Sequence, residues 1–176
     1  MYAVWVTHAP YTRPMKLATS SEVAFQDAIE HNHCWGCGPN NPAGLRLKSR
    51  WQGDVAVAHF TPAEHHTAAP THVVNGGILA TAVDCHAVCT AMADAYRQEG
   101  RAVGEAPAIW YATGKLQLEY LRPTPIGREL RITSHVEARA GRRTTLRCVV
   151  EADGHATVEA VVVAVRVPHG WMGGNR

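Results

Sequence analysis

The sequence has little net charge. Its 17 basic and 15 acidic residues nearly cancel, which leaves a formal net charge of +2 at pH 7. Domains that bind nucleic acid usually carry a strong basic excess or a dense basic stripe. Apart from one short arginine cluster near residue 140, this chain has neither. The composition therefore argues against a nucleic-acid partner.

The chain also lacks internal repeats and low-complexity segments. Its first residues, MYAVWVTHAPYTRP, contain no basic start and no continuous apolar stretch, so no signal peptide is expected. The longest apolar run, residues 73–93, is interrupted by Asn75, Asp84 and His86. Charged and amide groups are costly in a bilayer, so this run predicts a buried helix of a soluble protein and no membrane partner.

Cysteine is present in an odd number. The five residues are Cys34, Cys37, Cys85, Cys89 and Cys148. Without a secretory context, this count favours reduced thiols in a cytoplasmic protein over a disulfide framework.

A length of 176 residues and a hydrophobic content of 46% fit one globular domain. We expect residues 1–41 to form an N-terminal extension. It would contain a short capped helix near residues 21–31, followed by a loop rich in Cys, Gly and Pro. The folded domain is expected over residues 42–168, and residues 169–176 form a C-terminal tail.

Hydrophobic periodicity predicts the order of elements within the domain. Leu45 and Leu47, and then Val55 and Val57, alternate with polar residues around Gln52-Gly53-Asp54, which predicts a β-hairpin. A long helix and four strands follow. The helix runs from Gly76 to about Gln98, one strand lies around residues 114–120, and three more lie near residues 129–139, 142–152 and 155–167. Turns are expected at Ala140-Gly141 and Asp153-Gly154.

The predicted helix is apolar on all sides. Ile78, Ala82 and Cys85 lie on one stripe, while Ala80 and Val88 lie on the opposite one. A helix of this kind has to be covered all round. We therefore predict an α+β fold in which one antiparallel β-sheet wraps around the long central α-helix and a second subunit supplies the remaining cover.

Asp84 is the only acidic residue between Val73 and Ala93, and its helical neighbours Ala80 and Val88 are apolar. A carboxylate in such surroundings is desolvated, which raises its pKa. It could be held by the backbone or a histidine for structural reasons. We favour a general base or nucleophile, because perturbed carboxylates cluster at functional sites. No His, Cys, Asp or Glu stands at ligand spacing from it, so no catalytic metal is expected.

Asn75-Gly76-Gly77 stands where the loop becomes the helix. Asparagine is a good N-cap, and two glycines let a ligand approach the backbone closely. The free N–H groups at a helix start suit a developing oxyanion. The motif could equally be a plain cap and turn, but an isolated Asp84 eight residues after Gly76 favours a site.

The segment VVNGGILATAVD, residues 73–84, resembles the signature of the phenylacetate-degradation-type (PaaI-like) hotdog acyl-CoA thioesterases. There, His-Gly-Gly opens the central helix and an Asp follows two turns later. Residues 114–123, GKLQLEYLRP, are similar to that family's strand after the helix, and the likeness covers roughly residues 42–167. Asn75 stands where the family usually has His.

The resemblance implies a hotdog fold and hydrolysis of an acyl-CoA to free acid and CoA, with no cofactor beyond the CoA of the substrate. It implies that a backbone N–H at Gly76 or Gly77 polarises the thioester carbonyl and that Asp84 activates water or attacks directly. Thr113 matches a hydroxyl residue that positions water or the Asp. A non-catalytic acyl-CoA or lipid-binding module is the main alternative. A dehydratase would need a catalytic His at the helix start.

The densest basic patch is Arg139-Ala-Gly-Arg142-Arg143. It matches the turn with which related enzymes contact the phosphates of coenzyme A, and arginine forks suit phosphate. A solvated turn is an equal alternative.

The loop with His31, His33, Cys34 and Cys37 has the residue types of a zinc site, but it lacks a second spaced ligand pair. A similar Cys-x-Gly-Cys-Gly segment precedes the first strand in some hotdog thioesterases. We therefore expect a packing loop and no bound metal.

Gly76 and Asp84 are eight residues apart on the predicted helix, so their backbones are separated by about 12 Å. An oxyanion donor and a base must both come within about 3 Å of the groups they serve. The two can meet on one thioester only across two antiparallel copies of the helix. This geometry predicts an obligate homodimer and leaves a dimer of dimers (a homotetramer) open.

Overall fold

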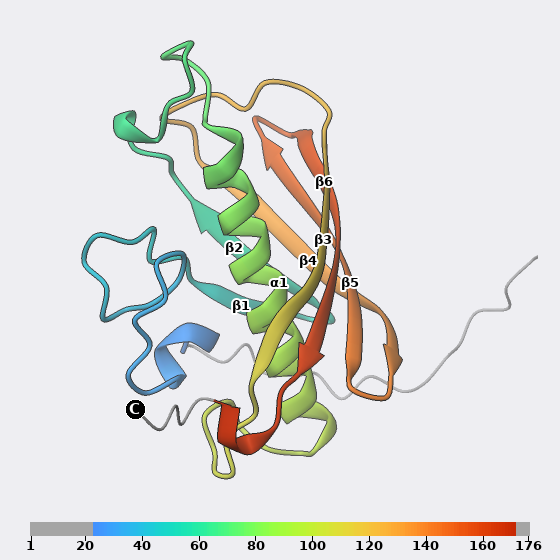
Figure 1. The fold of residues 1–176 in the computed structure, drawn as a ribbon. Coiled ribbons are helices and arrows are strands. Elements are labelled where there is room, and N and C mark those ends of the chain that lie inside the picture. The colour runs from blue at the N-terminus through green and yellow to red at the C-terminus, as the bar shows by residue number, and fades with distance from the viewer. Residues whose placement is uncertain (1–22, 172–176) are drawn as a thin grey trace, which may run out of the picture.

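A computed structural model describes residues 23–171. A single long helix, α1 (Gly76–Gln98), lies along one face of a six-stranded antiparallel sheet (Figure 1). The strands follow the order β1-β2-β4-β5-β6-β3. Their bounds are β1 Ser49–Gln52, β2 Val55–Phe60, β3 Tyr111–Tyr120, β4 Leu130–Ala140, β5 Arg143–Ala152 and β6 His155–Arg166. Three short 3-10 helices complete the described elements, η1 Phe25–Ala28, η2 Glu64–His66 and η3 His169–Trp171.

The sheet curls around α1, so the predicted α+β hotdog arrangement is confirmed. The helix has the predicted bounds, and the three C-terminal strands lie within a residue or so of their expected positions. The tight turns between them also form as expected. Gly141 (φ 58°) and Gly154 (φ 76°) adopt left-handed conformations that suit short hairpin connections.

Two local expectations were wrong. The first strand begins only at Ser49, because the Leu45 and Leu47 N–H groups donate to the carbonyls of Trp35 and Gly36 instead of joining the sheet. The expected N-terminal helix is the four-residue 3-10 helix η1, whose N-cap has no side-chain hydrogen bond. The earlier part of the extension, residues 1–22, which includes the expected start of that helix, lies outside the described residues.

Most of α1 is buried in the core, including Ala82, Val83 and Ala87. By length and composition α1 could cross a membrane, but 61% of its most apolar window is buried inside the protein. One stripe of the helix remains partly open. Asp84 and Val88 lie on it, one turn apart. At the sheet edge nearby, β3 pairs with β6 and, among the described residues, with no other strand.

Candidate functional site

Asp84 lies in the middle of α1, on its partly open stripe, and faces β3. Its Oδ1 accepts a hydrogen bond of 2.5 Å from Thr113 Oγ1. Burial raises the pKa of the Asp84 carboxyl, and the bond from Thr113 opposes that rise in part. The Asp84 carboxylate is therefore half-buried. Its Oδ1 is hydrogen-bonded to the Thr113 hydroxyl, and its Oδ2 is not bonded to that hydroxyl. That arrangement suits a proton acceptor.

The position of Thr113 depends on an irregularity in β3. Thr113 pairs with Ala164 and Lys115 with Val163, so Gly114 is an extra residue that forms a β-bulge. A side chain at Gly114 would meet Val165 Cγ2 at 2.7 Å, which explains why glycine occupies the bulge. Bulges re-aim neighbouring side chains and are frequent next to active sites. The Thr-Gly pair is the sequence signal for this feature.

Asp84 and Thr113 open into a cavity of about 750 Å³. This volume falls in the range of small-molecule sites. The walls come from α1, β3 and the N-terminal segment, and most of them are apolar. They include Ile29, Val88, Met92, Trp110 and Tyr111. The cavity can therefore hold an apolar group beside a carboxylate that accepts a proton.

At the other predicted part of the site, Asn75 caps α1. Its Oδ1 accepts a hydrogen bond of 2.8 Å from the Gly77 N–H. This contact uses the Gly77 donor, so Gly77 as the structure places it has no N–H to offer to a substrate. No acceptor for the Gly76 N–H is found among residues 23–171. Gly76 is therefore the better candidate for an oxyanion donor.

Tyr120, which no sequence motif marks as a site residue, covers the start of α1. Its hydroxyl donates to the Gly76 carbonyl at 2.9 Å. A side chain at Gly76 would meet that hydroxyl at 3.2 Å. Gly76, Gly77 and Tyr120 line a second groove of about 550 Å³. The strand predicted around residues 114–120 includes this tyrosine, but only the fold shows that it reaches the helix start.

The structure thus brings Asp84 and Thr113 together but leaves Gly76 apart. Asp84 lines the larger cavity, while Gly76 lines the second groove at the helix start. Within one chain, the predicted base and the predicted oxyanion donor do not face a common space.

The arginine cluster is only partly available for a ligand. Arg139 forms a bidentate ion pair with Asp94. Its Nε donates to Oδ2 at 2.7 Å and its Nη2 donates to Oδ1 at 2.8 Å. Asp94 is 2% exposed. Arg142 Nε donates to the Arg166 carbonyl at 2.8 Å. Arg143 is exposed, and no partner for its side chain is found within residues 23–171.

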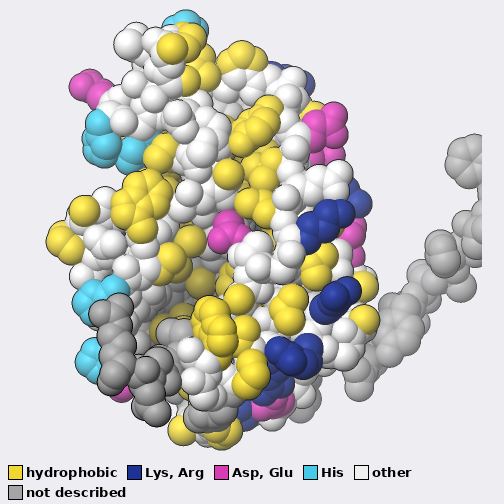
Figure 2. Space-filling view, in the orientation of Figure 1, with side chains coloured by type: hydrophobic (Ala, Val, Ile, Leu, Met, Phe, Trp, Pro, Cys, Tyr) yellow, Lys and Arg dark blue, Asp and Glu magenta, His cyan; other side chains and the backbone are white. Residues whose placement is uncertain are grey.

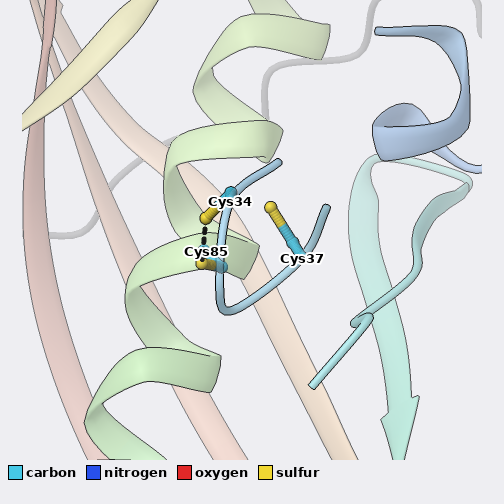
Figure 3. A group of neighbouring side chains, drawn as sticks. All are labelled: Cys34, Cys37 and Cys85. Atoms are coloured by element: carbon cyan, nitrogen blue, oxygen red, sulfur yellow. Dashed lines mark hydrogen bonds between the residues drawn. The ribbon is translucent and has the colours of Figure 1, made fainter. Parts of the chain in front are cut away.

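Four cysteines converge at the wall of the larger cavity, and we call them the four-cysteine cluster: Cys34, Cys37, Cys85 and Cys89. Figure 3 shows the first three, with the loop cysteines facing the helix. Hydrogen bonds from neighbouring thiols lower the pKa of Cys37. Hydrogen bonds to the loop thiols, together with burial, raise the pKa of Cys85 and of Cys89. Cys148 is buried on β5, apart from the cluster. His31 and His33 also line the cavity.

His86, the residue two positions after Asp84, has a structural role. Its Nδ1 meets Ser49 Oγ at 2.8 Å and its Nε2 meets the Ala56 carbonyl at 3.2 Å. Ser49 in turn is bonded to Gln26, which fastens the N-terminal segment to β1. Burial lowers the pKa of His86 to about 4, so the ring is neutral, donates from Nε2 and accepts at Nδ1.

Comparison with known proteins gives a clear structural likeness. No curated protein matches the chain significantly. A family model described as the NPCBM-associated, NEW3 domain of alpha-galactosidase matches residues 138–175. That stretch contains β5 and β6 but neither α1 nor β3, so it includes neither Asp84 nor Thr113.

Among solved structures, a thioesterase superfamily protein from Shewanella loihica PV-4 is 31% identical to this chain. The match has a TM-score of 0.62 and covers 82% of this chain and 100% of that one. The E. coli PaaI protein from the phenylacetic acid degradation operon is 13% identical, with a TM-score of 0.57 and coverage of 70% of this chain and 81% of that one.

A Streptococcus mutans UA159 protein, solved with acetyl-CoA bound, is 10% identical, with a TM-score of 0.55 and coverage of 69% and 88%. At the identities of these last two proteins, the likeness shows the fold alone. The whole length of the Shewanella protein is similar to this chain.

Proposed function

Because the chain belongs to the thioesterase superfamily, we propose that it is an acyl-CoA thioesterase, which hydrolyses an acyl-CoA to a free acid and coenzyme A. The proposal rests on the position of Asp84. Its half-buried carboxylate opens into an otherwise mostly apolar cavity of about 750 Å³, with Thr113 bonded to one of its oxygens. A module that only bound acyl groups would gain nothing from a desolvated carboxylate there.

Asp84 acts as the general base in this proposal. It takes a proton from a water molecule while the water oxygen attacks the thioester carbonyl carbon. Thr113 holds Oδ1, which leaves Oδ2 for the water. The carbon–sulfur bond then breaks, coenzyme A leaves as a thiolate, and that thiolate takes the proton back from Asp84. The raised pKa of Asp84 makes the carboxylate a better proton acceptor.

The acyl group fits the larger cavity, because Val88, Met92 and Trp110 line the same cavity as Asp84. The S. mutans relative binds acetyl-CoA on the same fold, which supports a coenzyme A thioester as the class of substrate.

The negative charge that develops on the carbonyl oxygen needs a donor, and the Gly76 N–H of a second protomer meets that need. Within one chain, Gly76 and Asp84 line separate cavities. An antiparallel pairing of two α1 helices would bring the Gly76 of one chain to the Asp84 of the other. We therefore retain the shared-site homodimer as part of the proposal.

The surface around β3 supports such pairing. As an edge strand, β3 presents unpaired backbone groups. Tyr120 and Leu121, at its end, are 53% and 41% exposed. Figure 2 shows hydrophobic side chains gathered over α1 and β3 on this face. Two copies of the chain could cover one another there.

The test of the function is the release of free thiol from acyl-CoA esters of short, medium and long chains and of an aromatic acid. A blank with protein alone is needed, since the chain carries five cysteines of its own. We expect multiple turnovers with at least one class. Tight binding of acyl-CoA without thiol release from any ester would instead support the binding module.

A further inference from the structure

Four of the five cysteines meet where the loop at residues 34–37 lies against α1. Cys34 Sγ is 3.6 Å from Cys85 Sγ, and Cys37 Sγ is 4.0 Å from Cys89 Sγ. The sulfurs of Cys34, Cys37 and Cys85 all lie within 4.8 Å of one another. The loop thus contributes a pair three residues apart, and the helix contributes a pair one turn apart.

This spacing of sulfurs agrees with the geometry of a tetrathiolate metal site. Zinc binds cysteine sulfur at about 2.3 Å in a tetrahedron, which places neighbouring sulfurs about 3.8 Å apart. The Cys34–Cys85 and Cys37–Cys89 separations, 3.6 and 4.0 Å, lie on either side of that value. Cys89 is outside the three-sulfur group, so its side chain has to turn toward the other three sulfurs to complete the fourth corner.

We propose that the four-cysteine cluster binds one structural zinc ion in a tetrahedral site. The sequence motif alone lacked a second ligand pair, and α1 supplies it through Cys85 and Cys89. Within residues 23–171, this cluster contains the one group of three side chains with metal-ligating atoms close enough to share an ion.

The loop is shaped to deliver its cysteines to the helix. Gly36, between the two loop cysteines, lies so close to α1 that a side chain there would meet Cys85 Sγ at 2.3 Å. The Asn32 side chain accepts from the Cys34 N–H at 3.1 Å, and the Gly38 N–H donates to the Cys34 carbonyl at 2.8 Å. These bonds fold the loop into a tight turn that presents both thiols on one side.

Four thiolates fill the coordination of zinc and leave no position for a substrate water. The ion would therefore link the N-terminal segment to α1 at the wall of the larger cavity, which Asp84 also lines. Its role is to hold that wall in place. The inference rests on the cysteines alone and does not depend on the proposed reaction.

The test is the metal content of the full-length protein, produced with zinc in the medium and purified under reducing conditions without chelator. We expect inductively coupled plasma mass spectrometry to find one zinc ion per protein chain. After exchange, Co²⁺ should give a thiolate-to-cobalt charge-transfer band in the near ultraviolet and the intense visible bands of a tetrahedral ion. Cys34→Ala and Cys85→Ala should abolish these bands, and Cys89→Ala should change them.

Cys148→Ala is the matched control, because it removes a buried thiol outside the cluster. It should keep both the zinc and the cobalt spectrum. Far-ultraviolet circular dichroism checks the fold, and Cys34, on an exposed loop, is the variant least expected to disturb it. Wild-type protein with no more zinc than the Cys85→Ala variant would overturn the proposal. So would a Cys34–Cys85 disulfide found by peptide mapping of freshly prepared protein, or a wild-type cobalt spectrum from Cys89→Ala.

Discussion

The Thr113 hydroxyl donates a hydrogen bond of 2.5 Å to Asp84 Oδ1, and it joins β3 to the middle of α1. The bond fixes the orientation of the carboxylate in the larger cavity. It also stabilises the charged form against the burial that raises the pKa of Asp84.

Thr113→Val keeps the shape of the side chain but removes the donor. We expect kcat to fall roughly tenfold with KM nearly unchanged, because a positioning group contributes less than the base it serves. Thr113→Ser retains a hydroxyl and should recover most of the activity. Steady-state kinetics on the best acyl-CoA checks this, and a Thr113→Val enzyme with wild-type kcat would remove Thr113 from the mechanism.

The shared site predicts complementation between two inactive variants. Gly76→Pro removes one backbone donor at the first position of α1, where proline is tolerated. Asn75 has φ −61° and ψ 133°, an extended conformation that accepts a following proline. A side chain at this position meets the Tyr120 hydroxyl at 3.2 Å, so Tyr120, which is 53% exposed, has to shift relative to the Gly76 carbonyl to which it donates. Asp84→Asn removes the base.

Each variant alone should be nearly inactive. A mixed dimer contains one intact site and one doubly damaged site, so refolding the two variants together should restore roughly a quarter of wild-type activity. Native mass spectrometry verifies the pairing. Mixed dimers without activity would show that Gly76 and Asp84 of different chains do not serve the same thioester.

The ion pair between Arg139 and Asp94 predicts a role in stability. Arg139→Met leaves the buried Asp94 carboxylate without its partner, which should lower the free energy of unfolding by about 1–3 kcal/mol. Arg143→Met, in the same hairpin, should change it by no more than about 0.5 kcal/mol. Urea denaturation of the three proteins measures the difference. Equal stability of both variants would mean that the Arg139–Asp94 pair contributes nothing.

Arg143 remains the best candidate in the basic cluster for the phosphates of coenzyme A, because its side chain is exposed and Arg139 and Arg142 have protein partners. Arg143→Met should raise KM for the acyl-CoA severalfold at low salt, and less at high salt where charges are screened. A thioester of N-acetylcysteamine, which has no phosphate, is the control substrate. An equal rise in KM for both substrates would argue against phosphate recognition.

The features that could be predicted from the sequence are those with local causes. The bounds of α1 follow from the Asn75 cap and from Gly100, whose φ of 69° ends the helix. The hairpins follow from short Gly-containing turns between strands of period two. Asp84 stood out because a lone carboxylate in an apolar helix needs a reason to be there.

The features that could not be predicted depend on contacts between distant segments. Leu45 and Leu47 have the period of a strand, yet their backbones pair with the loop at residues 35–36. Cys85 and Cys89 share one stripe of the apolar helix, a pattern that indicates core packing only. The helix sequence alone does not indicate that Cys34 and Cys37 pack against this stripe.

In the proposed reaction, the role of Asp84 is to activate the water that cleaves the thioester. The most direct test of this role is the turnover of Asp84→Asn, measured as thiol release from the best acyl-CoA, together with the binding of a nonhydrolysable acyl-CoA thioether by calorimetry. The substitution keeps the size of the side chain and removes its basicity. We expect unchanged thioether binding and a kcat lower by roughly a hundredfold or more, the scale of a lost general base. Full turnover by the Asp84→Asn protein would contradict this role.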